Sequence, residues 1–159
     1  MRIRLATTDD IRAILTLQHK APEAAHWTQG DYQHLMQDPG GKILVAELDT
    51  MEPPKLLGFA AFHRIIDEVE VRNMAVDPEH RQQGIGRGLL VTAREHMLRA
   101  GAKRIFLEVR ASNKSAQSLY YSIGFALHSV RKDYYREPQE DALVLAMELY
   151  PPTVVPDYL

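Results

Sequence analysis

The sequence predicts a single domain of the α/β class, built on a mixed, mostly antiparallel sheet. The chain has 159 residues, 45% of them hydrophobic and 25% charged, which is enough for one domain with a core and short for two. Three extended segments, residues 42–48, 56–65 and 68–76, follow one another across short turns, as in an antiparallel meander. An apolar strand at 104–109 then stands between two segments of helical period, so we expect it to pair in parallel with 68–76.

The first 41 residues carry the signals of one short strand and two helices. Thr7 or Thr8 suits the cap of the first helix, since acidic residues follow it, and Thr28 suits the cap of the second. A turn rich in proline and glycine at 38–41 ends the second helix. The predicted elements are a strand at 1–5, a helix to about His19, an irregular segment at 21–27 and a helix at 28–36.

The chain after residue 76 also carries clear signals of separate helices and strands. Apolar residues recur every four positions from Ile85 to Met97, which is the period of a helix with one buried face. Gly101 and Gly124 suit the ends of two helices. The predicted elements are a helix at 84–99, the strand at 104–109, a helix from 112 or 113 to about 122, and a hairpin of strands 125–135 and 142–149. The chain therefore reads as one seven-stranded domain at residues 1–149, followed by a proline-rich tail at 150–159.

Composition and charge exclude several kinds of protein. The formal net charge of −2 gives no general signal for nucleic-acid binding. Without cysteine the chain has neither disulfides nor a cysteine nucleophile, which fits a cytoplasmic protein. The polar start MRIRLATTDD is no signal peptide, and no apolar run approaches the ~20 residues that cross a membrane. The seven histidines lack metal-binding spacing, so no metal is expected.

The strand at 68–76 contains an irregularity in its alternation. Val69 and Val71 place the apolar face at odd positions, whereas Met74 and Val76 place it at even positions. Because side chains alternate with a period of two along a strand, one extra residue near positions 72–73 restores a single apolar face. We therefore predict a β-bulge there; the alternative is a strand buried on both faces.

The residues between this strand and the next helix suit an anion. Gly84 and Gly86 open the helix, and Arg81 and Arg87 flank it. Glycines let a ligand approach the backbone, and the free N–H groups of the first helical turn attract negative charge. This pattern predicts a cradle for a pyrophosphate, against the alternative of a simple turn. The loop lacks the Gly-Lys-Ser/Thr of a nucleoside-triphosphate loop and the third glycine of a dinucleotide fingerprint.

Two side chains could move protons beside this cradle. Glu108 lies among apolar residues of the strand at 104–109, where desolvation would raise its pKa and make it a base. It could instead face water or pair with Arg110 or Arg72. Tyr120, on the following helix, could donate a proton or belong to the core. Asn113 could cap that helix or bind a ligand.

Together these motifs resemble the GCN5-related N-acetyltransferases (GNAT), whose Arg/Gln-x-x-Gly-x-Gly/Ala signature is matched by RQQGIG at 81–86. The segments at 73–90, 107–125 and 133–149 are similar to the ribosomal-protein-alanine N-acetyltransferase group of that family. The resemblance covers residues 1–149 and implies a GNAT fold. In that fold a seven-stranded mixed sheet splits into a V between its fourth and fifth strands, with about four helices on its two faces.

The resemblance also implies a ligand and roles for individual residues. Acetyl-CoA would lie in the V as co-substrate, Glu108 would be the general base and Tyr120 the general acid. The acetyl group would pass directly to an amine, since no cysteine can carry it. The residues implied to bind acetyl-CoA are Met74, Ala75, Val76, Arg81, Gln82, Gln83, Gly84, Ile85, Gly86, Arg87 and Asn113.

The acceptor implied by the resemblance is a protein N-terminus, in this group an N-terminal alanine of a small-subunit ribosomal protein. The expected groove residues are Trp27, Tyr134 and Tyr135, with acidic Glu137, Glu140 and Asp141 suited to a basic peptide; alternatively, the acidic loop is only solvated. Residues 25–27 read Ala-His-Trp where family members often have Phe-Pro-Trp. An acetyltransferase for small amines or other N-termini, and a non-catalytic acyl-CoA-binding module, remain alternatives. Neither membrane nor direct nucleic-acid binding is expected, and the oligomeric state stays open.

Overall fold

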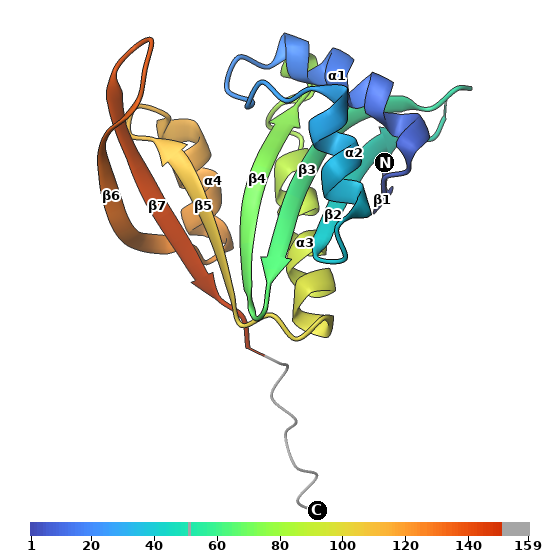
Figure 1. The fold of residues 1–159 in the computed structure, drawn as a ribbon. Coiled ribbons are helices and arrows are strands. Elements are labelled where there is room, and N and C mark those ends of the chain that lie inside the picture. Colours follow the sequence, from blue (N-terminus) through green and yellow to red (C-terminus); the bar gives the residue numbers. More distant parts are fainter. Residues whose placement is uncertain (51, 151–159) are drawn as a thin grey trace, which may run out of the picture.

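The computed structural model describes residues 1–50 and 52–150, so the predicted tail lies outside the described residues except for Tyr150. These residues form a seven-stranded sheet in the order β1-β2-β3-β4-β5-β7-β6 (Figure 1). The β4–β5 pair is parallel and the other pairs are antiparallel, as predicted. The strands are β1 (Arg2–Leu5), β2 (Gly41–Leu48), β3 (Lys55–Ile65), β4 (Glu68–Val76), β5 (Arg104–Arg110), β6 (Ala126–Tyr135) and β7 (Glu140–Glu148).

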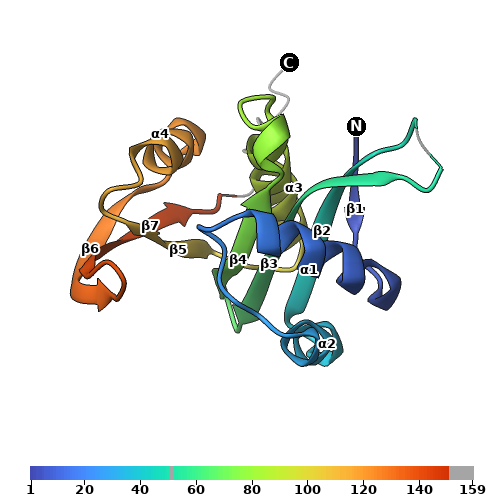
Figure 2. The ribbon, with the colours of Figure 1, turned by 90° about the horizontal axis from the view of Figure 1, so that it is seen from above.

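Helices cover both faces of the sheet. The first is α1 (Ile11–Lys20), entered through a 3-10 turn at Thr8–Asp10, and it is followed by α2 (Gln29–Gln37); both pack on one face of β2–β4. The other face carries α3 (Ile85–Arg99) and α4 (Lys114–Ile123), which lie on the opposite side from α2 in the view from above (Figure 2). The Thr28 hydroxyl accepts the N–H of Asp31 at 3.2 Å, so the predicted cap of α2 is confirmed. None of the helices in the described ranges is long and apolar enough to cross a membrane.

The sheet splits between β4 and β5. The two strands pair only from Glu68 with Arg104 to Glu70 with Phe106. Beyond these three pairs the strands diverge towards their carboxyl ends, which gives the V implied by the resemblance (Figure 1). The second half of β4 therefore has β3 on one side and an open edge on the other.

The predicted bulge is confirmed at Arg72. On β3, Ala61 pairs with Asn73 while Phe62 pairs with Val71, so Arg72 is the extra residue. As a result Val71 and the half-buried Met74 both join the core beneath α3, whereas Asn73 turns towards α1 and α2. The bulge thus changes which side chains face each half of the protein.

A glycine lets α3 approach this part of the sheet. A Cβ built on Gly58 of β3 would lie 3.0 Å from Ile85 Cγ2 and 3.1 Å from the Ala75 carbonyl oxygen. Contacts that short require the neighbours to move, so a larger residue at position 58 would push the start of α3 away from the sheet. Gly58 therefore helps to fix the predicted ligand loop against β4.

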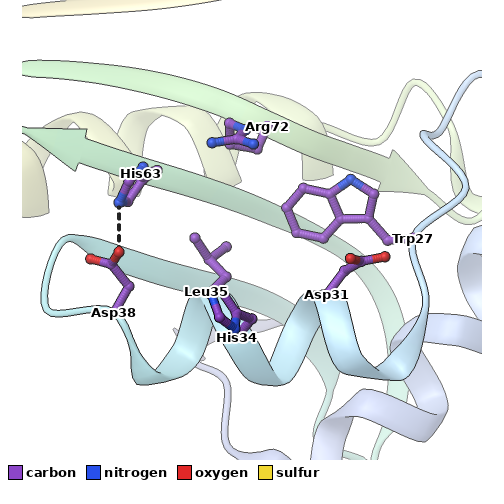
Figure 3. A pocket seen from close by; sticks show the side chains of 7 residues that line it. All are labelled: Trp27, Asp31, His34, Leu35, Asp38, His63 and Arg72. Atoms are coloured by element: carbon purple, nitrogen blue, oxygen red, sulfur yellow. Dashed lines mark ion pairs between the residues drawn. The ribbon is translucent and has the colours of Figure 1, made fainter.

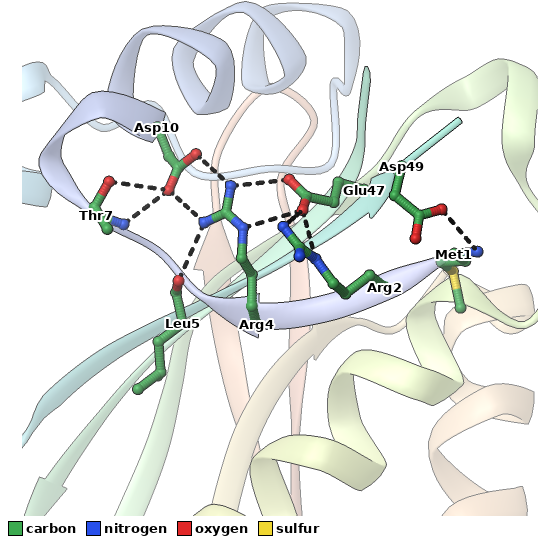
Figure 4. Close-up of polar contacts among 8 residues, drawn as sticks. All are labelled: Met1, Arg2, Arg4, Leu5, Thr7, Asp10, Glu47 and Asp49. Carbon is green, nitrogen blue, oxygen red and sulfur yellow. Dashed lines mark hydrogen bonds and ion pairs between the residues drawn. The ribbon is translucent and has the colours of Figure 1, made fainter. Parts of the chain in front are cut away.

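An ionic network fastens the β1 edge (Figure 4). Glu47 of β2 is only 2% exposed and accepts hydrogen bonds from Arg2 and Arg4. The Arg4 guanidinium also forms two bonds of 2.8 and 2.9 Å with Asp10 at the start of α1. Bonding to Arg4 is the largest cause of the lowered pKa of both Glu47 and Asp10. The first strand is thereby tied to β2 and to the first helix.

Candidate active site

The predicted pyrophosphate loop ends at a bare helix N-terminus. Gln82 and Gly84 have φ of 59° and 79°, in the left-handed region, and α3 begins at Ile85. No side chain caps Gly84, and the helical ladder starts with the bond from Gly88 N–H to the Gly84 oxygen, at 2.9 Å. The N–H groups of the first turn consequently lack intrahelical partners and can bind an anion.

Gly86 brings three elements together behind this loop. A Cβ at this position would lie 3.2 Å from Leu119 Cδ2 on α4 and 3.2 Å from Met74 Cε on β4. The start of α3, the open half of β4 and the inner face of α4 therefore converge at one place. The predicted loop and the predicted proton donor on α4 belong to the same site.

The two arginines that flank the loop have different partners. Arg87 is exposed and its Nη1 donates to the Ser122 hydroxyl of α4 at 3.1 Å. Arg81 forms an ion pair with Glu23, which lies in the connection between α1 and α2. A phosphate that binds Arg81 has to compete with Glu23 for the guanidinium. Gln82 and Gln83 are exposed between them.

The open edge of β4 offers backbone groups to a ligand in the V. The Asp77 N–H donates to the Leu57 oxygen of β3 at 2.8 Å. Because successive residues of a strand direct their backbone groups to opposite sides, Met74 and Val76 direct theirs away from β3. Ala75 directs its groups towards β3 and is 3% exposed. An extended chain in the V can therefore bond Met74 and Val76. Together with the bare start of α3, this edge fits a ligand that joins an extended arm to a pyrophosphate.

Glu108 lies on the same face of β5 as Phe106, as the alternation predicted. That face is half-buried, whereas Leu107 and Val109 point into the core. The Glu108 carboxylate lies 3.2 Å from Nε of Arg131 on β6, and its side chain is 21% exposed. A hydrogen bond to Glu108 is also the largest cause of the raised pKa of Tyr134.

The surroundings of Glu108 therefore differ from the sequence expectation. The carboxylate is not isolated among apolar side chains, and its cationic partner is neither Arg110 nor Arg72. Arg110 lies 3.0 Å from Glu140, and Arg72 lies 3.9 Å from Glu70. The partner of Glu108 comes from β6, which is separated from β5 by β7 in the sheet.

Tyr120 is a protonated phenol at neutral pH. Its ring packs on the core at 5.9 Å from the ring of Phe125. Burial raises the pKa of Tyr120 to about 12, and the charges of Tyr135 and Glu23 add to the shift. The hydroxyl therefore keeps a proton that it can donate. Asn113 caps α4, since its Oδ1 accepts the N–H of Ala116 at 3.1 Å.

The predicted groove residues fall into two groups. Tyr134 and Tyr135 are in edge-to-face contact on β6, at 5.2 Å between ring centroids. Glu140 bonds the backbone N–H and hydroxyl of Ser112, at 3.1 and 3.0 Å, in addition to Arg110. Bonds to Ser112 and Arg110 hold the pKa of Glu140 below its usual value. Glu140 thus fastens β7 to the start of α4, which leaves less of its charge for a peptide.

Trp27 lies apart from these residues, in the connection between α1 and α2. It borders a cavity of about 240 Å³ between α2 and the strands (Figure 3). An ion pair of 3.1 Å between His63 and Asp38 closes one end of it. The residues that line this cavity are Trp27, Asp31, His34, Leu35, Asp38, His63 and Arg72.

Among the described residues, one group has the composition of a metal site. Asp77, Glu79 and His80 place their ligand atoms within 4.8 Å of one another. The Asp77 carboxylate already accepts the N–H of Glu79 at 3.0 Å and lies 3.7 Å from the Lys55 ammonium. These contacts fasten the turn after β4, and the absence of a metal stays a prediction.

The split sheet and the bare helix start after β4 are the features that an acyl-CoA-dependent transferase needs to hold its cofactor. The family model described as "Acetyltransferase (GNAT) family" matches residues 8–125, and the chain belongs to this family. It is therefore an acetyl-CoA-dependent N-acetyltransferase, which removes the non-catalytic alternative.

Individual relatives support the same assignment. The chain is 32% identical over 144 residues to the [ribosomal protein bS18]-alanine N-acetyltransferase of Escherichia coli (strain K12), with 89% of this chain and 93% of that protein covered. The corresponding Haemophilus ducreyi protein is 35% identical over 133 residues, with 80% and 88% covered. The crystal structure of the Escherichia coli ribosomal-protein-S18-alanine N-acetyltransferase has a TM-score of 0.83 at 30% identity, with 94% of each chain covered. Spermidine N-acetyltransferase SpeG from Vibrio cholerae shares the fold, with a TM-score of 0.80 at 19% identity and 94% and 95% covered.

Proposed function

We propose that this enzyme transfers the acetyl group of acetyl-CoA to the α-amine of a protein N-terminus, of the ribosomal-protein-alanine type. The observation that carries the proposal is the 32% identity, over about nine-tenths of both chains, to an enzyme named for alanine of ribosomal protein bS18. In this proposal Glu108 of β5 is the base and Tyr120 of α4 is the acid. Such an enzyme works in the cytoplasm, where ribosomal proteins are made.

Glu108 prepares the amine. A free α-amine has a pKa of about 8, so it is mostly protonated at neutral pH. The Glu108 carboxylate accepts one proton, directly or through a water molecule, and leaves a neutral nucleophile. The ion pair with Arg131, at 3.2 Å, holds this carboxylate in place on the half-buried face of β5.

Met74 and Tyr120 act on the thioester. The Met74 N–H, at the open edge of β4, donates a hydrogen bond to the carbonyl oxygen as negative charge develops there. The amine nitrogen bonds to the acetyl carbon, the carbon–sulfur bond breaks, and Tyr120 gives its proton to the departing thiolate. A phenol with a pKa of about 12 is a weaker acid than a thiol, so this transfer is uphill and is completed when the tyrosinate takes up the proton that the acylated nitrogen releases, directly or through water. Holding both substrates in one cleft removes much of the entropic barrier.

The first turn of α3 and its loop hold the pyrophosphate. The N–H groups of Ile85, Gly86 and Arg87 supply the donors, with Gln82 and Gln83 beside them. Arg81 joins them once it has left Glu23. Asn113 lies at the start of α4 and contacts the pantetheine arm in addition to capping its helix.

A second candidate is acetylation of small amines or of other protein N-termini. It is retained because residues 25–27 depart from the Phe-Pro-Trp that the resemblance leads one to expect. The same catalytic groups would serve, and only the acceptor loops would differ.

An acceptor panel tests the proposal. The enzyme is mixed with acetyl-CoA and with a peptide that begins with alanine and continues with the bS18 sequence. Parallel reactions contain the same peptide with a blocked N-terminus, one with an internal lysine, or spermidine. Thiol release and the mass of each product are measured. We expect a gain of one acetyl group on the free N-terminus; preferential acetylation of spermidine would refute the proposal.

A further inference from the structure

An uncharged polar network lies buried between β4, α1 and α2. Asn73, Gln18 and Tyr32 are 4%, 8% and 0% exposed. The Asn73 amide donates to the Tyr32 hydroxyl at 3.0 Å and to the Gln18 Oε1 at 3.3 Å, and Tyr32 also donates to Gln18. Buried polar groups are destabilising unless they are hydrogen-bonded. Three of them together in an apolar layer therefore suggest a role beyond packing.

The network holds the connection between α1 and α2, residues 21–28. The Asn73 Oδ1 accepts the N–H of Ala25 at 3.0 Å, and its Nδ2 donates to the Ala25 oxygen at 3.2 Å. The Gln18 Nε2 donates to the Trp27 oxygen at 2.9 Å. Side-chain amides thereby bind two residues of the connection in the way that a neighbouring strand would. Trp27 is further fixed by its ring contact with Tyr32, at 5.0 Å.

The bulge makes this arrangement possible. With Arg72 as the extra residue, Asn73 faces α1 and α2. The next residue, Met74, directs its backbone groups to the open edge of the V. The same strand therefore carries, on adjacent residues, the anchor of the connection and the donor proposed for the thioester. In the view from above, the connection reaches towards the split between β4 and β5 (Figure 2).

We infer that Asn73 is a positioning residue that holds the acceptor loop, residues 21–28, at a fixed distance from the thioester site. The inference rests on the proposed function and adds a residue to it. Asn73 itself touches neither substrate. It acts by fixing Ala25, and through Gln18 also Trp27, so that a bound peptide presents its first residues at the correct distance from Met74. A minimal amine that does not reach the loop gains nothing from this arrangement.

The test compares a long and a minimal acceptor. Asn73→Leu keeps the number and branching of the side-chain heavy atoms but leaves both backbone groups of Ala25 without the amide. We expect kcat/KM for the alanine-initiated peptide to fall about tenfold, mainly through KM, which corresponds to one net hydrogen bond. For alanine amide the fall should stay below twofold, and the Kd for acetyl-CoA should not change. Hydrogen exchange at Ala25 and Trp27 should accelerate.

Two further variants separate positioning from folding. Glu47→Gln destabilises the distant β1 edge and should leave the ratio of the two acceptors unchanged. Gln18→Leu removes the bond to the Trp27 oxygen and the acceptor that Asn73 and Tyr32 share, but it keeps both bonds between Asn73 and Ala25. It serves as the test if Asn73→Leu does not fold. Equal losses for peptide and alanine amide, or an unchanged peptide KM, would overturn the role of Asn73. A wild-type enzyme that acetylates no N-terminus would instead refute the proposed function.

Discussion

Replacement of Gly84 by alanine tests the predicted pyrophosphate loop without disturbing the packing of other side chains. Gly84 has a φ of 79°, and a Cβ built on it has no other atom within 4 Å. The added methyl group would therefore stand in open space beside the first turn of α3. Gly101→Ala is the matched control, because Gly101 also has a positive φ, of 87°, and open space around a built Cβ, but it follows the other end of α3.

The effects of the two substitutions on stability can be worked out from these surroundings. An alanine in the left-handed region destabilises the folded state by about 1–2 kcal/mol. Alanine also lowers the conformational entropy of the unfolded chain, which stabilises the protein by about 0.4–1 kcal/mol. Gly84→Ala should therefore lower the free energy of unfolding by about 1 kcal/mol, or about 2–4 °C in Tm. Gly101→Ala should lower the free energy of unfolding by a similar amount, because its backbone conformation and its open surroundings are the same.

Calorimetry with acetyl-CoA and thermal unfolding without ligand give the decisive comparison. If the pyrophosphate approaches the backbone at Gly84, the methyl group blocks it and the Kd should rise at least about tenfold, beyond the loss explained by stability. Gly101→Ala should lose similar stability and bind acetyl-CoA with a Kd within a few-fold of the wild type. A Gly84→Ala protein that is destabilised as expected and still binds acetyl-CoA normally would refute the location of the cradle.

Three further substitutions probe the catalytic groups and the β1 edge. Glu108→Gln should lower kcat about 10²–10⁴-fold in steady-state assays and leave the acetyl-CoA Kd unchanged; normal turnover would remove Glu108 as the base. Tyr120→Phe should also lower kcat, and because the pKa of Tyr120 is raised to about 12, the wild-type rate should show no loss from its ionisation up to about pH 10. Glu47→Gln should cost about 3 kcal/mol in urea unfolding, since it leaves the arginines without their buried carboxylate. Because the pKa values of Glu47 and Asp10 are lowered, their stabilisation is complete above about pH 4 and is lost as the pH falls through their folded values. The variant should therefore lose less stability in acid than the wild type.

Much of the fold follows from patterns that are local in the sequence. The position of the bulge could be predicted because the apolar residues of β4 change from odd to even positions, from Val69 and Val71 to Met74 and Val76. The caps at Thr28 and Gly124 were equally visible, since a helix end depends on a few adjacent residues. The V was different: it came from the family resemblance, because no pattern within one strand shows where its neighbour stops pairing.

The polar partners of the site could not be predicted in the same way. Glu23 lies 58 residues from Arg81, and Asn73 lies 48 residues from Ala25, so only the folded chain brings each pair together. The bulge was nevertheless a usable signal for Asn73. The bulge turns Asn73 away from the apolar face beneath α3. Its amide therefore needs hydrogen-bond partners on the other side of the sheet.

The partner of Glu108 depends on strand register. The pairing of β6 with β7 shifts twice, between Leu127 and Ser129 and between Arg131 and Tyr135. The first shift adds one residue to β6 and so inverts its alternation before Arg131, whereas the second adds two residues. Arg131 could therefore not be matched with Glu108 from spacing alone. The charged loop after β6 drew attention to Glu140, which instead pairs with Arg110.

The pairing of Glu108 with Arg131 is consistent with its proposed use as a base. The guanidinium of Arg131 lies 3.2 Å from the carboxylate, so a cation already occupies the position that the proposed substrate amine needs. The arriving α-ammonium carries the same charge as Arg131 and can take its place beside the carboxylate. Arg131 is 56% exposed on an edge strand, and an ion pair exposed to that degree contributes only about 0–1 kcal/mol. Its displacement therefore costs little, so the ion pair does not keep the amine away from Glu108.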